Sequence, residues 1–158
     1  MKSKLSHIDR SGNPAMVDVS EKEVTLRTAT AQASVFLGKT ILAAVRNNEL
    51  STKKGPVFHT AIVAGVMGAK KTSELIPFCH PLGLDDCRIK LLVKGERVII
   101  QSSATVNGRT GVEMEALTAA AIAALTVYDM CKALSHEIEI EEIKLMSKTG
   151  GKTNFSRK

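Results

Sequence analysis

The sequence has few aromatic residues, and this shortage argues against one common partner of basic proteins. Its 158 residues include no tryptophan, one tyrosine and four phenylalanines, and none of these lies within a basic run. Proteins that bind single-stranded nucleic acid usually stack the bases on aromatic side chains. We therefore expect no nucleic acid partner and rank a small phosphorylated ligand above RNA or DNA.

Cysteines are also scarce and scattered. Cys79, Cys87 and Cys131 are odd in number and contain no C-x-x-C spacing, which argues against a disulfide scaffold and favours a reducing compartment. Combining them with His80 or His59 matches no common zinc-site spacing. The N-terminus lacks the apolar stretch of a signal peptide, and no apolar run has the length and flanks of a membrane span. We expect a cytoplasmic protein without a membrane partner.

Basic residues, in contrast, are in excess. Lysine and arginine total 22 against 16 acidic residues, giving a net charge of +6, which favours an anionic partner. Two Gly-Lys-Thr triplets suggest phosphate-binding loops, but the P-loop pattern requires a glycine where Met146 and Ala33 stand. A P-loop nucleoside triphosphatase is therefore excluded.

The hydrophobic pattern predicts one α+β domain. We expect a flexible N-terminal arm over residues 1–15, a single domain over 16–147 and a basic, flexible C-terminal tail over 148–158 that contributes to the site. Apart from a short helix at 39–49, treated as an insertion, the order from residue 23 is strand, helix, strand, strand, helix, strand. That order is typical of the ferredoxin-like fold, an antiparallel sheet with helices packed on one face. The expected strands are 16–20, 23–37, 88–94, 97–105 and 137–146, and the expected helices are 39–49, 58–72 and 110–132.

The helix expected at 110–132 is the most informative segment. Residues 116–128 carry no charge and are rich in alanine and leucine, which predicts a buried helix whose small residues pack against another subunit. Glu113 and Glu115 suit the positive end of the helix dipole, whereas Asp129 lies at the unfavourable negative end, one turn before Lys132. Asp129 and Lys132 form either an ordinary surface ion pair or an acid–base pair whose burial lowers the pKa of the amine.

Three further segments carry candidate functional residues. His80 lies in a rigid segment bracketed by two prolines, and Lys53 and Lys54 lie in a loop beside a glycine. Lys148 and Lys152 flank two glycines, so lysine side chains and backbone N–H groups could form an anion cradle there. The alternatives are a satisfied loop histidine, a solvated turn and a disordered basic tail, respectively.

Several long motifs in these regions are specific. GVEMEALTAA at 111–120, LTVYDMCKA at 125–133, IPFCHPL at 76–82 and KTGGKT at 148–153 together resemble the cyclic pyranopterin monophosphate synthase family, also called the molybdenum cofactor biosynthesis protein C family. The resemblance covers residues 7–152. It implies a lyase that converts (8S)-3',8-cyclo-7,8-dihydroguanosine 5'-triphosphate to cyclic pyranopterin monophosphate and releases pyrophosphate.

The resemblance also implies the site residues and the assembly. The family's catalytic groups fall on Asp129, Lys132 and Lys54, although Lys53 is adjacent and either lysine could face the substrate.

The resemblance implies a homohexamer built as a trimer of dimers, with active sites at subunit interfaces. No carboxylate cluster calls for a metal, so we expect no cofactor, and the sequence leaves open whether Mg²⁺ accompanies the triphosphate. The substrate-binding positions fall on Phe78, Cys79, His80, Met114 and Glu115, with Glu113 beside the ring and with Arg27, Lys148 and Lys152 for the triphosphate.

Overall fold

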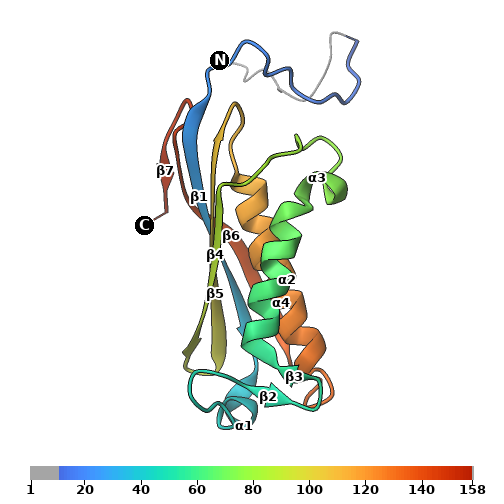
Figure 1. The fold of residues 1–158 in the computed structure, drawn as a ribbon. Coiled ribbons are helices and arrows are strands. Elements are labelled where there is room, and N and C mark those ends of the chain that lie inside the picture. Colours follow the sequence, from blue (N-terminus) through green and yellow to red (C-terminus); the bar gives the residue numbers. More distant parts are fainter. Residues whose placement is uncertain (1–10, 158) are drawn as a thin grey trace.

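A computed structural model of the chain describes residues 11–157. Most of the expected N-terminal arm, residues 1–10, lies outside the described residues. The described part folds as a five-stranded antiparallel sheet with helices packed on one face, so the predicted α+β class is confirmed (Figure 1).

The sheet has the strand order β4-β5-β1-β6-β7, and β1 lies at its centre. Side chains alternate along β1: Ala29, Ala31 and Ala33 are buried beneath the helices, whereas Thr30 and Gln32 point to the other face, as expected for a strand with one covered side. The strands span Thr25–Phe36 (β1), Asp86–Lys94 (β4), Arg97–Gly108 (β5), Glu139–Thr149 (β6) and Phe155–Ser156 (β7).

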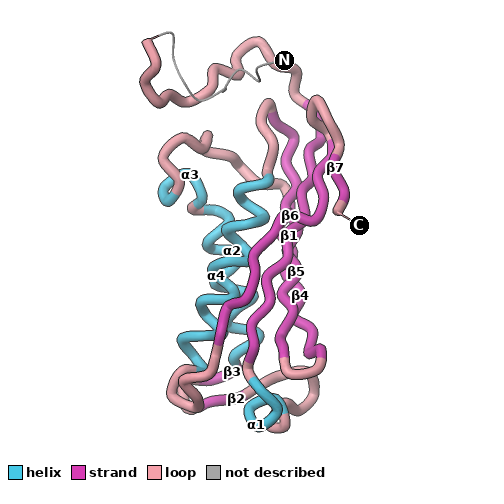
Figure 2. Tube along the Cα trace, turned by 180° about the vertical axis from the view of Figure 1, so that it is seen from behind, coloured by secondary structure: helices cyan, strands magenta, loops and turns pink. Residues whose placement is uncertain are grey.

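Two helices cover one face of this sheet, α2 (Val57–Lys70) and α4 (Glu113–Cys131). α4 packs on β1, β5 and β6, while α2 packs on α4 and β4 (Figures 1 and 2). The two helices approach closely at Gly65, where an added Cβ would lie 2.8 Å from the carbonyl oxygen of Ala119. α4 is long and apolar enough to cross a membrane, but 56% of that stretch is buried inside the protein, as expected for a core helix.

The helix predicted at 39–49 is largely wrong. Only α1 (Gly38–Leu42) is helical. Arg46 and Glu49 exchange backbone hydrogen bonds of 2.9 Å across a tight turn, in which Asn47 and Asn48 have φ angles of 51° and 59°. Asparagine tolerates this left-handed conformation, so the Asn pair forms a two-residue turn and the chain is not helical through Glu49. Short elements that the sequence did not predict are β2 (Ser51–Thr52), β3 (Gly55–Pro56) and α3 (Thr72–Leu75).

Two further predictions are corrected near the ends of the described chain. Residues 16–20 are not a strand; instead, the carbonyl oxygen of Val17 accepts a hydrogen bond from His80. The C-terminal segment, expected to be flexible, continues β6 to Thr149 and then returns as β7, with Lys148 opposite Phe155. Both errors have the same cause. Whether a segment forms a strand depends on a pairing partner that is distant in the sequence, and the local pattern does not show that partner.

Candidate functional site

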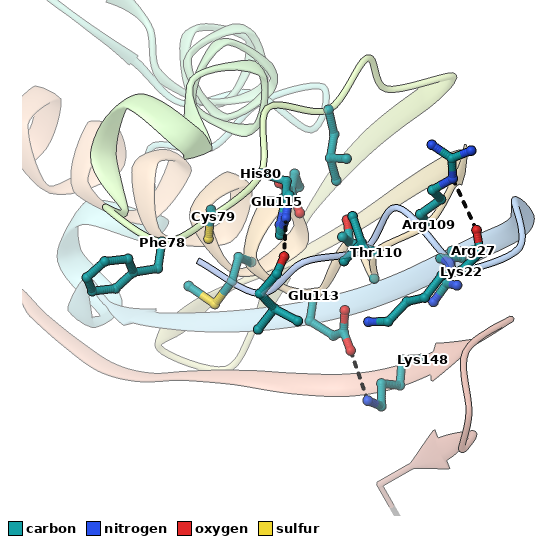
Figure 3. A pocket seen from close by; sticks show the side chains of 15 residues that line it. Lys22, Arg27, Phe78, Cys79, His80, Arg109, Thr110, Glu113, Glu115 and Lys148 are labelled. Carbon is teal, nitrogen blue, oxygen red and sulfur yellow. Dashed lines mark hydrogen bonds and ion pairs between the residues drawn. The ribbon is translucent and has the colours of Figure 1, made fainter. Parts of the chain in front are cut away.

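A cavity of about 500 Å³ opens beside the N-terminal end of α4. The first turn of α4 supplies Glu113, Met114 and Glu115, and the irregular segment before β4 supplies Phe78, Cys79 and His80. Figure 3 shows Phe78, Cys79 and His80 at one end of this cavity, and Lys22, Arg27 and Arg109 at the other. Residues implied by the resemblance from three distant parts of the chain therefore meet in one place.

Glu115 is the most deeply buried acid of the cavity, with 4% of its surface exposed. Burial raises the pKa of its carboxyl, and the neighbouring Glu113 raises it further. Within the described part of the chain, no other residue donates a hydrogen bond to this carboxylate. The carboxylate is bonded only by the backbone N–H of Glu115 itself, which lowers the pKa but does not offset burial. Such a buried acid is costly for the fold, so its position favours a role in binding a ligand that donates hydrogen bonds.

The segment across from Glu115 is held by specific contacts. His80 Nε2 lies 2.8 Å from the carbonyl oxygen of Val17, and because a carbonyl only accepts, Nε2 carries the hydrogen. Nδ1 of the ring is then available to the cavity. Burial raises the pKa of the Cys79 thiol, as does the nearby Glu115, so this group remains a neutral thiol. Phe78 lies at the rim and is 40% exposed.

The other end of the cavity is cationic, and its side chains are fixed by contacts that use only part of each group. Arg27 Nε donates to the carbonyl oxygen of Gly108 at 2.8 Å, and Arg109 Nε donates to that of Lys22 at 3.1 Å. Each guanidinium thus keeps its outer N–H groups available for an anion. Lys148 Nζ pairs with Glu113 at 2.9 Å.

The sequence did not predict two of these cations. Arg109 directly precedes the TGVEME motif, so its position offered a signal that could have identified it. Lys22 had no such signal, because it reaches the cavity through the segment before β1.

A smaller hollow of about 210 Å³ adjoins the cationic end and shares Arg27 and Lys148 with it. Lys152 and Gly151 complete its wall. The turn that carries them is packed tightly, since Thr25 Oγ1 donates to the Gly150 carbonyl oxygen at 2.7 Å and a Cβ at Gly150, whose φ is +82°, would collide with the backbone of Leu26. The alternative of a disordered basic tail is therefore wrong for this segment.

A second cluster lies at the opposite, C-terminal end of α4. The Asp129 carboxylate holds one ammonium group at each oxygen, Lys132 Nζ at 2.7 Å from Oδ1 and Lys54 Nζ at 2.7 Å from Oδ2. Lys54 Nζ also donates to the backbone carbonyl oxygen of Asp129 at 2.9 Å. It thereby satisfies one of the carbonyl groups left unpaired at a helix end, and it offsets the unfavourable position of Asp129 in the helix dipole. Lys54, rather than Lys53, makes this contact.

The charges of this cluster differ from one expectation of the sequence. A hydrogen bond from Lys132, followed by one from Lys54, lowers the pKa of Asp129 to about 2. The same contact raises the pKa of Lys132. Burial was expected to lower the pKa of this amine, but its side chain is 57% exposed in the single chain, so attraction to Asp129 dominates.

Cys131 lies two residues from Asp129 but faces the core. It is fully buried, and burial raises the pKa of its thiol to about 11. All three cysteines are free.

The two clusters are separate within one chain. Glu115 and Asp129 lie 14 residues apart on α4, a distance of roughly 21 Å along the helix axis. The structure thus brings together Asp129, Lys132 and Lys54, and separately all of the predicted substrate-binding residues, but it does not bring the two sets together. Across residues 11–157, no group of three or more histidine, cysteine, aspartate or glutamate side chains is arranged to hold a metal ion.

Known proteins resemble this chain over nearly its whole length. A protein of Xanthomonas campestris pv. campestris named cyclic pyranopterin monophosphate synthase is 53% identical over 155 residues, which cover 97% of this chain and 93% of that protein. A protein of the same name from Xanthomonas axonopodis pv. citri is 52% identical over 154 residues, with the same two coverages.

A less similar relative contains a matching region within a longer protein. Molybdenum cofactor biosynthesis protein 1 of Drosophila melanogaster is 46% identical over 157 residues, which cover 98% of this chain and 27% of that protein. The MoaC family matches residues 16–151, a range that includes both clusters except for Lys152. The chain therefore belongs to the MoaC family.

Proposed function

We propose that this protein is a cyclic pyranopterin monophosphate synthase of molybdenum cofactor biosynthesis. It is a lyase that converts the cyclised dihydroguanosine triphosphate to cyclic pyranopterin monophosphate and pyrophosphate. The observation that carries the proposal is the Asp129 carboxylate held between the ammonium groups of Lys54 and Lys132, the three residues for which the resemblance implies catalytic roles.

The reaction needs proton transfer, and the cluster at the C-terminal end of α4 supplies it. Opening and reclosing the purine-derived ring requires donors and acceptors within hydrogen-bond reach of the reacting atoms. Lys132 and Lys54 donate protons, and Asp129 holds both amines in place and balances their charge. When substrate and protein exclude water from the cluster, desolvation lowers the pKa of the lysines towards the range useful for catalysis.

The reaction also expels pyrophosphate, and the cationic end of the cavity suits that step. Negative charge develops on the leaving oxygens, and fixed cations stabilise it. Arg27, Lys148 and Lys152 meet there, together with Lys22 and Arg109. The excess of positive charge in the sequence is thus explained by a triphosphate rather than by nucleic acid.

The part of the cavity around Glu115 suits the guanine-derived ring. The ring carries an exocyclic amino group and ring N–H groups, all of which donate hydrogen bonds. The Glu115 carboxylate has acceptor sites that no residue of the described chain uses, and Glu113 lies beside it. We propose that these two glutamates orient the ring.

We propose that two copies of the chain share each site. A face of exposed apolar side chains runs along α4 from Met114 (37% exposed) to Leu125 (54%) and Tyr128 (36%) and continues onto α2 at Val63 (59%). If two copies pack α4 against α4 in antiparallel orientation, the midpoint between residues 114 and 129 lies beside Ala121. Such a two-fold contact brings Asp129 of one copy to the cavity of the other. Three such dimers would form the homohexamer.

We infer the ferredoxin-like fold for the single domain over residues 16–147, with the basic segment 148–158 contributing Lys148 and Lys152. The order of the first four strands across the sheet, β4-β5-β1-β6, with α2 and α4 as the two crossovers, supports this assignment. The proposed chemistry uses only side chains of the protein, so we propose no resident cofactor; any Mg²⁺ enters with the triphosphate. Three free cysteines agree with the cytoplasm as the place of action.

The decisive experiment is a mass-spectrometric assay. The purified protein is incubated with the cyclised nucleotide, and formation of the cyclic phosphate product is followed. The rival function, a basic module that binds RNA without catalysis, predicts no product and salt-sensitive binding of oligonucleotides. Thermal melts with pyrophosphate or with an oligonucleotide distinguish the two, because a ligand of the folded state raises the melting temperature.

A further inference from the structure

Glu49 is an acid outside both clusters, yet its carboxylate is almost fully engaged. Oε1 accepts hydrogen bonds from the backbone N–H groups of Leu50 (2.8 Å) and Phe58 (2.7 Å). Oε2 accepts from the backbone N–H of His59 (3.0 Å) and contacts Nδ1 of the same ring. The Glu49 side chain is 15% exposed, whereas the His59 side chain that it contacts is 77% exposed.

These contacts replace the usual cap of a helix. α2 begins after Pro56, which provides no side-chain cap, so the first N–H groups of the helix need other acceptors. The carbonyl oxygen of Leu50 accepts from Val57 at 2.8 Å, and Glu49 accepts from the next two residues. Glu49 and Leu50 therefore join the chain before the β2–β3 hairpin to the first turn of α2.

The hairpin closed in this way carries Lys54 at its tip. β2 and β3 pair only at Ser51 with Pro56 and at Thr52 with Gly55. The Lys54 backbone N–H also donates to Thr52 Oγ1 at 3.2 Å. Two paired positions hold a hairpin weakly by themselves, so its direction depends on how its base is fastened. That base is where the Glu49 side chain accepts its hydrogen bonds.

We propose that Glu49 is a positioning residue that fastens the base of the β2–β3 hairpin and so holds the Lys54 ammonium group on Asp129. The catalytic consequence of this role rests on the proposed function, whereas the contact itself does not. Burial would raise the pKa of Glu49, but the bonds from Phe58, His59 and Leu50 outweigh burial and keep it below its usual value. The carboxylate is therefore ionised and acts only as an acceptor at neutral pH.

The substitution Glu49→Gln tests the proposal with little change in shape. An amide has one acceptor oxygen and one NH₂ group, so it must lose the hydrogen bonds at one end of the carboxylate. We expect the hairpin to move and kcat to fall by about 10- to 100-fold, as small displacements of catalytic groups do, with KM changed by less than about twofold. Glu96→Gln is the matched control, because Glu96 is a glutamate at the exposed turn between β4 and β5.

A double-mutant cycle separates positioning from a purely structural role. If Glu49 acts through Lys54, Glu49→Gln lowers kcat in the parent but changes it by less than about twofold in a Lys54→Ala background. Its effect on the melting temperature remains in both backgrounds. A structural role alone would lower kcat by the same factor in both, and that result would overturn the proposal.

A second readout does not depend on activity. The ¹³C resonance of the Asp129 carboxyl reports its ionisation, and with a pKa of about 2 it is only about 1% protonated at pH 4. Lys54→Ala should raise this pKa, and Glu49→Gln should raise it in the same direction, whereas Glu96→Gln should not. The proposal fails if Glu49→Gln leaves the titration of Asp129 at the parent value, or if Lys54→Ala does. If both variants shift it but retain full turnover, the contact holds and the catalytic assignment of Lys54 is what fails.

Discussion

The two ends of α4 carry acids in opposite situations. At the N-terminal end, Glu115 is buried and accepts no hydrogen bond from another residue of the described chain, and two arginines of the same cavity use only part of their hydrogen-bonding capacity. At the C-terminal end, Asp129 is exposed and fully paired with two lysines. The first arrangement destabilises the free protein and suits a bound ligand, while the second is already satisfied in water. Under the proposed function, α4 thus carries the binding end of the site at its N-terminus and the reactive end at its C-terminus.

The largest effect is expected from breaking the reactive end. Asp129→Asn and Lys132→Ala should each lower turnover by about 10²- to 10⁴-fold, because each removes a charged group from the proton-transfer cluster. The mass-spectrometric assay measures this loss. Circular dichroism and the melting temperature should stay close to those of the parent, since both side chains are about half exposed. Full activity in either variant would remove the assignment.

Mixing two inactive variants tests whether each active site combines the N-terminal end of α4 from one copy with the C-terminal end of α4 from another. One carries Asp129→Asn, the other carries Arg27→Ala with Lys148→Ala, and the subunits are exchanged by unfolding and refolding together. A mixed dimer has one intact site of two, and mixed dimers make up half of the population, so about a quarter of the parent activity should return.

The control for this experiment mixes Asp129→Asn with Lys132→Ala. Both changes damage the same end, so no pairing of subunits creates an intact site and activity should stay at the background. If the first mixture also stays inactive although exchange is verified by mass spectrometry, each site is formed by a single copy.

A smaller effect is expected at the binding end from Glu115→Gln. The unfolded chain loses the Glu115 proton near its ordinary pKa of 4.5, whereas the folded protein retains it to a higher pH because the pKa is raised. The unfolded state therefore binds fewer protons in this window, and the stability of the parent falls as the pH rises through it. The amide escapes this penalty, so its melting temperature should exceed that of the parent by on the order of 2–4 °C at pH 7.

Thermal melts from pH 4 to pH 8 check this prediction. The difference between the two proteins should shrink as the pH approaches 4, where Glu115 is protonated in both states. KM should rise in the variant, because the ring loses an ionised acceptor. A variant less stable than the parent at pH 7 would contradict the inferred cost of the buried acid.

The smallest effect is expected from Lys53→Ala. Lys53 has no partner within the described chain, so turnover should change by less than about twofold, while Lys54→Ala should resemble the Asp129 variant. Steady-state kinetics of the two alanine variants decide which lysine serves the reactive end. Equal losses would mean that both contribute.

Local pattern was enough to predict most of the elements and part of the site. The uncharged run in α4 and the alternation along β4, β5 and β6 placed those elements nearly correctly, because each pattern continues over most of the helix or strand. Asp129 and Lys132 could be paired from their spacing on one helix. The Lys54 contact spans 75 residues, and only the family resemblance indicated it.

The remaining features depend on contacts that no local pattern encodes. The sequence placed Glu115 and Asp129 at opposite ends of one helix, but it did not indicate which distant side chains gather at each end, because Arg27, His80 and Lys54 reach α4 only through the fold. The Asn47–Asn48 turn and the capping role of Glu49 were missed for a related reason. Helical periodicity extended across a segment whose backbone turns back on itself.

The buried thiol of Cys131 has a practical consequence for the reactive end. With a pKa of about 11, only about one molecule in 10⁴ carries a thiolate there at pH 7. Alkylating agents and peroxides attack thiolates, so this cysteine is chemically silent although it lies two residues from Asp129. Thiol-directed reagents therefore leave Cys131 unmodified in the segment that carries Asp129 and Lys132.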